Sequence, residues 1–236
     1  MRTALITGGS RGVGAECVRA FARAGFRVAF FYCRSHQAAR QLAEQTGAVA
    51  IPCDVADPAQ VRQAVDHALR QLSHIDVLIN NAGIAQQKLI TDVTDDDWRR
   101  MLDTNLSGAF YLCRAVLPHM ISRKSGAVIN ISSIWGQVGA SCETHYSAAK
   151  AGLIGFTKAL AKEVGPSGVT VNCLCPGVIQ TDMLSAFGPD DLAALAQETP
   201  LGRIGDPADV AHAALWLSDA AFVTAQIIGV NGGFGE

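Results

Sequence analysis

Short apolar runs alternate with longer amphipathic segments from one end of this 236-residue sequence to the other. The apolar runs are nearly continuous, as in Val28-Ala29-Phe30-Phe31, which is typical of parallel strands that helices cover on both faces. The alternation predicts an α/β, doubly wound fold with a single seven-stranded parallel sheet and helices on both faces. We expect the strands at 3–7, 27–32, 48–53, 76–80, 127–132, 169–174 and 226–230.

Helices are expected between these strands, at 12–24, 36–46, 58–73, 95–121, 146–164 and 207–218. Thr94 stands before three aspartates, which indicates a helix N-cap with carboxylates in the first turn rather than a metal site. The segment 182–206 departs from the regular alternation of apolar runs and amphipathic segments. We expect it to be a mobile excursion over the site with a short helix inside. No linker or repeat divides the chain, so residues 1–236 are expected to form one domain.

The charge and the cysteine pattern exclude several classes of function. A net charge of −2 without a clustered basic excess predicts no nucleic-acid partner and no binding to an anionic membrane. Residues 1–8 carry too short an apolar stretch for a signal peptide, and no run approaches the roughly 18 residues of a membrane span, so we expect a soluble, cytoplasmic protein. The seven cysteines are scattered without a C-x-x-C pair, which predicts reduced thiols and no metal site.

A glycine-rich turn, T-G-G-S-R-G-V-G at 7–14, joins the first expected strand to the first expected helix. Glycines there let the backbone turn sharply and approach a pyrophosphate, whose charge the helix N-terminus then stabilises. The spacing T-G-x-x-x-G-x-G resembles the Rossmann-fold turn of the short-chain dehydrogenases/reductases. The expected phosphate contacts are Gly8, Ser10, Arg11, Gly12, Val13 and Gly14.

The residues after the second strand indicate which dinucleotide binds. NAD-specific domains usually place an acid about 20 residues past the turn, to bind the ribose 2′-hydroxyl. Here Arg34 and Ser35 occupy that stretch, and no acid appears between Glu16 and Glu44. Arg11 and Arg34 would both face a 2′-phosphate, so NADP(H) is the expected cofactor. The lesser alternative for Arg34 alone is a solvated loop arginine.

Four further motifs follow in the order and spacing of the same family. They are Asn80-Asn81-Ala82-Gly83, Asn105, Ser133 and Tyr146-Ser147-Ala148-Ala149-Lys150, with Tyr146 thirteen positions after Ser133. Together with the glycine-rich turn they identify a resemblance to the short-chain dehydrogenases/reductases over essentially the whole chain. The resemblance implies one dinucleotide-binding and catalytic domain and an oxidoreductase that acts on CH-OH and C=O groups.

The chemistry of the catalytic residues can be argued from their types. Residues i and i+4 share a helix face, so Lys150 is expected beside Tyr146. A nearby ammonium and the oxidised nicotinamide favour phenolate, which we expect to lower the pKa of Tyr146 and make it a usable acid or base. Ser133 would stabilise the developing charge on the substrate oxygen. By resemblance, Asn105 distorts its helix to hold a proton-relay water, and Lys150 also binds the nicotinamide ribose.

The resemblance also implies the remaining cofactor contacts. Asp54 and Val55 would contact the adenine edge, and a loop on the ribose side would come after the fourth strand. A segment after the sixth strand would hold the nicotinamide carboxamide. These last two groups comprise Asn81, Ala82, Gly83, Pro176, Gly177, Ile179 and Thr181.

The substrate is left open among three alternatives. The whole chain is similar to 3-oxoacyl-[acyl-carrier-protein] reductases, but 85–89 departs from their pattern, and Ser167 stands where an arginine for carrier docking is usual; Lys124 would supply part of a basic patch. The stretch 132–143 looks more like the elongation factor P 5-aminopentanone reductases. Its Trp135 and Glu143 are candidate substrate contacts, with Glu143 pairing with a substrate amine or serving only the helix dipole.

Oxidation of a sugar, a sterol or a simple alcohol by the same residues is the third alternative. The possible partners are therefore a ketone carried on acyl carrier protein or on elongation factor P. The resemblance further implies a homotetramer in which the helices at 95–121 and 146–164 pair across two-fold axes.

Overall fold

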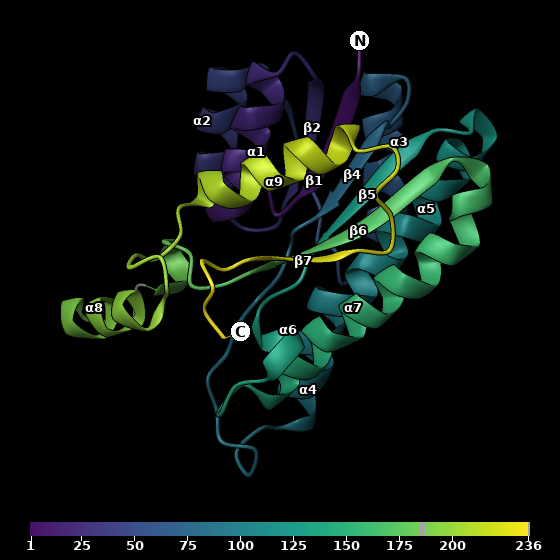
Figure 1. Cartoon of the computed structure of the whole chain (residues 1–236). Helices are drawn as coiled ribbons and strands as arrows, with labels where there is room; N and C mark the ends of the chain where they lie inside the picture. The colour runs from purple at the N-terminus through teal and green to yellow at the C-terminus, as the bar shows by residue number, and fades with distance from the viewer. Residues whose placement is uncertain (185–186, 236) are drawn as a thin grey trace.

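A seven-stranded parallel sheet runs through the computed structural model, which describes residues 1–184 and 187–235 (Figure 1). The strand order is β3-β2-β1-β4-β5-β6-β7, so the order reverses between β1 and β4. In such sheets ligands bind in the crevice outside the carboxyl ends of the strands at this reversal. The strands are β1 Thr3–Thr7, β2 Arg27–Tyr32, β3 Val49–Pro52, β4 Val77–Asn80, β5 Gly126–Ile131, β6 Val169–Pro176 and β7 Ile227–Val230.

Helices cover both faces of this sheet, which confirms the predicted doubly wound α/β class (Figure 1). One buried cluster joins α1, α2 and α9 to the sheet, and the other joins α3, α5 and α7 to the opposite face. The helices are α1 Gly12–Arg23, α2 His36–Thr46, α3 Pro58–Leu72, α4 Asp95–Leu102, α5 Gly108–Arg123, α6 Trp135–Val138, α7 Thr144–Val164, α8 Pro189–Glu198 and α9 Pro207–Asp219. Among the residues described, no helix is both long enough and apolar enough to cross a bilayer.

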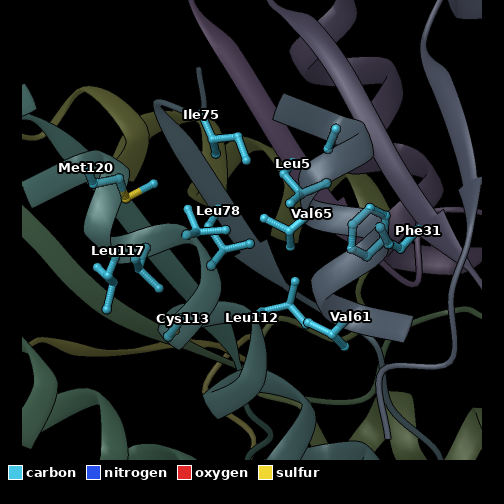
Figure 2. Close-up of a cluster of buried hydrophobic side chains, with 14 of the residues drawn as sticks. Leu5, Phe31, Val61, Val65, Ile75, Leu78, Leu112, Cys113, Leu117 and Met120 are labelled. Atoms are coloured by element: carbon cyan, nitrogen blue, oxygen red, sulfur yellow. The ribbon is translucent and has the colours of Figure 1, made fainter. Parts of the chain in front are cut away.

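The face that carries α3, α5 and α7 is packed with aliphatic and aromatic side chains (Figure 2). Leu5 of β1, Phe31 of β2 and Leu78 of β4 are fully buried. They belong to one cluster with Val61 of α3 and Leu112 of α5. Burying each such side chain contributes about 1.5–3 kcal/mol, so the strands are held in a fixed register and their carboxyl ends form a rigid edge.

The segment expected as a helix at 95–121 is helical, but its α-helical hydrogen-bonding pattern is interrupted. It consists of α4 and α5 with a π-helical turn, η1 Asp103–Ser107, between them. Asn105 lies in this turn, as the resemblance implied for a distorted helix. The predicted start of α4 is confirmed, because the Thr94 hydroxyl accepts from Asp97 N and the Asp97 carboxylate accepts from Thr94 N.

The segment 182–206 contains the predicted short helix, α8, which has no buried residue and stands away from the sheet (Figure 1). A single turn of 3-10 helix, η3 Asp182–Leu184, precedes it. Residues 185 and 186, which also fall within the predicted excursion, lie outside the described residues. The four-residue helix α6 was not predicted, because a single turn leaves no periodic pattern to detect.

Candidate active site

The glycine-rich turn after β1 is joined to the loop after β4 by side-chain hydrogen bonds. The Thr7 hydroxyl accepts from the backbone N–H groups of Asn81 and Ala82, each at 3.0 Å. The Asn81 amide donates to the carbonyl oxygens of Thr7 at 2.9 Å and Gly8 at 3.2 Å. These bonds hold the two loops together at the point where the strand order reverses. The role of Thr7 was not anticipated from the sequence.

Close backbone approach requires glycine in this turn. A Cβ at Gly14 would lie 2.2 Å from the Gly8 carbonyl oxygen, and Gly12 has a φ of +51°. The first turn of α1, which contains Val13, has no acidic residue, and its N-cap residue Arg11 forms no side-chain cap. The N–H groups at this helix end are therefore free of a capping side chain and suit an anion such as a pyrophosphate. Ser10 lies in the same turn.

The two arginines expected at a 2′-phosphate differ in their surroundings. Arg34 is exposed after β2, next to Ser35, and forms no ion pair with any residue that the structure describes. Arg11 is also exposed, and its guanidinium lies 3.5 Å from the carboxylate of Asp182 in η3. Asp182 had no sequence signal as a partner of Arg11, because the two residues are far apart along the chain.

The residues after β3 form a turn against the start of α5. The Asp54 carboxylate accepts from Ala56 N at 3.0 Å. Val55 is buried, and a Cβ at Gly108 would lie 3.0 Å from a Val55 methyl group. The glycine at the start of α5 thus allows Val55 to pack there, beside the carboxyl end of the sheet.

Ser133, Tyr146 and Lys150 meet at the carboxyl end of β5. Ser133 lies two residues after this strand, and Tyr146 and Lys150 lie one turn apart on α7; all three are buried. The Ser133 and Tyr146 hydroxyls are hydrogen-bonded. The Lys150 ammonium donates to the Ile131 carbonyl oxygen at 2.8 Å and lies 5.7 Å from the centre of the Tyr146 ring.

The expectation that Lys150 lowers the pKa of Tyr146 is wrong for this arrangement. Burial raises the pKa of Tyr146 to about 12, against a smaller lowering effect of the hydrogen bond with Ser133, and the nearby Glu143 raises it further. The Lys150 ammonium bonds to the β5 backbone instead, and burial lowers the pKa of Lys150 to about 8. The phenol is therefore protonated at neutral pH, which suits a proton donor.

Asn105 contacts the backbone that leads away from β4. Its side-chain oxygen accepts from Ile84 N and its amide donates to the Ile84 carbonyl oxygen, both at 2.9 Å. A Cβ at Gly83 would lie 2.5 Å from the Asn105 side-chain oxygen and 3.5 Å from Lys150 Nζ. The structure thus brings Gly83, Asn105 and Lys150 together, although 67 positions separate the first and the last.

The chain after β6 passes beside the glycine-rich turn. Pro176 ends β6, and the next residue, Gly177, donates its N–H to the Val230 carbonyl oxygen at the end of β7. Ile179 is buried and forms a β-bridge with Gly205. A Cβ at Gly12 would lie 3.2 Å from the Thr181 methyl group. The predicted carboxamide segment and the predicted phosphate turn are therefore neighbours.

The two candidate substrate contacts both lie near Tyr146. Trp135 N donates to the Ser133 hydroxyl at 3.2 Å, and the Trp135 ring packs edge-on against Phe234, with ring centres 5.6 Å apart. Glu143 is half-buried, and burial raises the pKa of its carboxyl. Its carboxylate accepts from the Gln87 amide at 3.4 Å. The contact of Phe234 with Trp135 was not predicted.

Two residues named for carrier docking lie elsewhere. Lys124 precedes β5 and Ser167 precedes β6, so both are at the amino end of the sheet, opposite to the catalytic residues. A Cβ at Gly168 would lie 2.6 Å from the Lys124 carbonyl oxygen, which places the two segments together. Within this chain, Lys124 and Ser167 therefore lie at the opposite end of the sheet from Ser133 and Tyr146.

Sequence and structure comparisons agree on the family. A family model described as "Enoyl-(Acyl carrier protein) reductase" matches residues 8–235. The chain is 40% identical to the 3-oxoacyl-[acyl-carrier-protein] reductase FabG of Chlamydia trachomatis, over 98% of this chain and 96% of the relative. It is 40% identical to the acetoacetyl-CoA reductase of Shinella zoogloeoides, over 98% of each chain.

A solved structure of 3-oxoacyl-[acyl-carrier protein] reductase from Brucella melitensis superposes with a TM-score of 0.92 at 35% identity, covering 100% of this chain and 91% of that chain. These matches are consistent with the NADP(H) cofactor expected from the sequence. They also place the chain among enzymes that act on C=O and CH-OH groups. The chain belongs to the short-chain dehydrogenase/reductase family of oxidoreductases.

Proposed function

We propose that residues 1–236 act as one cytoplasmic catalytic domain that reduces the ketone of a 3-oxoacyl thioester to a secondary alcohol with NADPH. The observation that carries the proposal is the group of Ser133, Tyr146 and Lys150, buried together at the carboxyl end of β5. Relatives of 36–40% identity are named for reduction of 3-oxoacyl groups on acyl carrier protein or of acetoacetyl-CoA. A thioester carried on acyl carrier protein is therefore the first substrate to test.

The cofactor part of the proposal rests on how the residues near the reversal of strand order between β1 and β4 fit NADPH. The uncapped first turn of α1 would hold the pyrophosphate, and exposed Arg34 would pair with a 2′-phosphate. Asp54 and Val55 would bind the adenine end, and the loops at 81–83 and 176–181 would bind the ribose and the carboxamide. The chemistry that bound NADPH supplies is hydride donation to the carbonyl carbon.

The catalytic residues perform the proton chemistry. Tyr146, with its raised pKa, keeps its proton at neutral pH and donates it to the ketone oxygen. Ser133 stabilises the charge that develops on that oxygen by a hydrogen bond. Lys150, whose ammonium bonds to the β5 backbone, binds the nicotinamide ribose. Asn105, next to Gly83 and Lys150, holds the water through which the proton is replaced.

The test is Tyr146→Phe in a steady-state NADPH oxidation assay with acetoacetyl-CoA and with an acetoacetyl carrier protein. We expect kcat to fall by about 10²-fold or more, because general acid catalysis contributes that much, while NADPH binding persists. Tyr111→Phe, on α5, removes a hydroxyl outside the site and is the matched control. Loss of less than about threefold in Tyr146→Phe contradicts the assigned proton donor.

A second candidate substrate is a ketone that bears an amine, as on modified elongation factor P. The observation that favours it is the half-buried Glu143 carboxylate, which forms no ion pair with any described residue and lies close enough to Tyr146 to raise its pKa. Such a carboxylate suits a substrate ammonium. Glu143→Gln then raises KM for the amine-bearing ketone and leaves acetoacetyl thioesters nearly unchanged. An equal effect on both substrates assigns Glu143 a structural role.

We also propose a homotetramer that pairs α4, α5 and α7 across two-fold axes. Phe110 of α5 is 40% exposed and packs against Phe156 of α7, so an apolar surface continues across both helices. Isologous pairing would cover this surface. Light scattering is expected to give about four times the chain mass of 24.8 kDa, and a monomer mass contradicts the proposal.

A further inference from the structure

The extended segment Ile84–Lys88, which we call the strap, runs between the π-helical turn and the start of the catalytic helix α7. Asn105 binds its first residue through both backbone groups of Ile84. At its other end, Lys88 N donates to the Cys142 carbonyl oxygen at 2.7 Å. The strap therefore touches both the proposed relay residue and the loop that leads into Tyr146.

The Asp97 carboxylate, in the first turn of α4, anchors the strap. It accepts from the Gln86 amide at 3.0 Å and from the Lys88 ammonium at 2.7 Å, as well as from Thr94. The hydrogen bond from Lys88, followed by those from Gln86 and Thr94, holds the pKa of Asp97 far below its ordinary value. Asp97 is thus a permanent acceptor at neutral pH, and it fixes which way the Gln86 amide points.

His145, which immediately precedes Tyr146, completes this chain of hydrogen bonds. It is fully buried, and its Nε2 lies 3.0 Å from the Gln86 side-chain oxygen. Because the Gln86 nitrogen donates to Asp97, its oxygen is the atom left to accept from His145, so the ring proton is assigned to Nε2. His145 Nδ1 is buried and has no hydrogen-bond partner among the described residues.

A buried acceptor without a partner costs about 1–3 kcal/mol, which an apolar side chain at this position would avoid. The direct consequence of having His145 there is the bond to Gln86, since no other hydrogen bond of the ring is present among the described residues. That bond ties the residue next to Tyr146 to the same strap that Asn105 holds. The two catalytic elements are thereby linked across 40 positions of sequence.

We propose that His145 and Gln86 are positioning residues that, through the strap, fix Tyr146 relative to Asn105 in the ketone reduction proposed above. Neither side chain reacts. A displacement of about 1 Å at a catalytic group can lower a rate by up to about 10²-fold. Loosening the strap at one of its several attachments should therefore lower kcat by about 10-fold. Binding of NADPH, whose proposed contacts lie on other loops, should be retained.

The experiment is a double-mutant cycle with His145→Leu, Gln86→Leu and the double variant, in the full-length chain. Exposed His67→Leu and Gln63→Leu on α3 are the matched controls and should leave kcat unchanged. Rates are expressed per NADPH-binding site by titration, so that misfolded protein is not counted. We expect each single variant to lower kcat by about 10-fold or more. The double variant should be no slower than Gln86→Leu, which already loses the bond to His145 as well as the bond to Asp97.

Hydrogen–deuterium exchange of the strap is the second measurement, and it does not depend on activity. Exchange at Lys88 N, which bonds to Cys142, should accelerate at least about tenfold in both single variants and in the double. The inference is overturned if the two single-variant effects on kcat multiply in the double variant, or if the single variants keep kcat within about twofold of wild type. Unchanged exchange at Lys88 N overturns it as well. A wild-type chain that oxidises no NADPH with any ketone overturns the proposed function instead, and the exchange data then decide whether the pair holds the strap.

Discussion

Gly14 offers a sharp test of how the turn after β1 is built. Its Cβ in Gly14→Ala would lie 2.2 Å from the Gly8 carbonyl oxygen and 2.5 Å from the Asn81 amide nitrogen. Real Cβ contacts do not fall below 3.0 Å, so Gly8 or α1 must move by about 0.8 Å. Gly8 and Asn81 both belong to the hydrogen-bonded junction between β1 and β4, which cannot move without losing the bond from Asn81 to Gly8.

The cost can be worked from these contacts. Overpacking a well-packed site costs about 1–3 kcal/mol, and the lost hydrogen bond adds about 1 kcal/mol. The total is about 2–4 kcal/mol, and for a chain of this size 1 kcal/mol lowers Tm by about 2–4 °C, so Gly14→Ala should lower Tm by about 4–16 °C. Displaced N–H groups should also weaken NADPH binding by at least about tenfold, which is about 1.4 kcal/mol.

Scanning fluorimetry and a fluorescence titration with NADPH measure the two effects. Gly155→Ala is the control, because a Cβ at Gly155, inside α7, meets no atom within 4 Å. Alanine is favoured over glycine inside a helix by up to about 1 kcal/mol, so this variant should gain about 2–4 °C and bind NADPH normally. A Gly14→Ala protein whose Tm stays within about 2 °C of wild type, or whose Kd for NADPH stays within about twofold, would refute the reasoning.

Two further predictions concern the cofactor and the pH dependence. Arg34 is exposed and has no ion pair among the described residues, so wild type should bind NADPH at least about tenfold more tightly than NADH. Arg34→Asp should reverse this preference. Equal affinities of wild type for NADPH and NADH contradict the assignment of Arg34 to the 2′-phosphate. Burial lowers the pKa of Lys150 to about 8, so the ammonium proposed to bind the nicotinamide ribose is present below that pH and is lost above it. The kcat/KM for reduction should therefore be level below pH 8 and fall above it, whereas a profile that stays level to pH 9.5 shows that Lys150 keeps its proton.

Much of the architecture and of the site is readable from local patterns in the sequence. Near-continuous apolar runs of four to eight residues indicated the strands, and the seven expected strands correspond to β1–β7 with small differences at their ends. Tyr146 and Lys150, four positions apart, had to share a helix face. The glycine-rich turn had to follow a strand and precede a helix. Each of these inferences depends on neighbours within a few residues, which is the range over which backbone geometry is determined.

The environment of the same residues was not readable in this way. The predicted direction of the Tyr146 pKa was wrong, because the sequence does not show that the phenol is buried or that Lys150 bonds to the backbone of β5. The distortion of the long helix at η1 was expected from the family resemblance and not from the periodicity of the sequence. Burial and the choice of hydrogen-bond partner depend on the packing of several elements at once, which no window of sequence contains.

The strap is the clearest case of a feature that only the tertiary structure decided. The sequence by itself determined the parallel sheet, the dinucleotide-type turn and the candidate catalytic residues, since spacing along the chain is sufficient to indicate all three. Gln86 and His145 carry no motif, and 59 positions separate them. They meet because the strap passes beside the loop that leads into α7, where Lys88 N donates to the Cys142 carbonyl oxygen. A hydrogen bond of 3.0 Å depends on where both of these backbone segments come to lie.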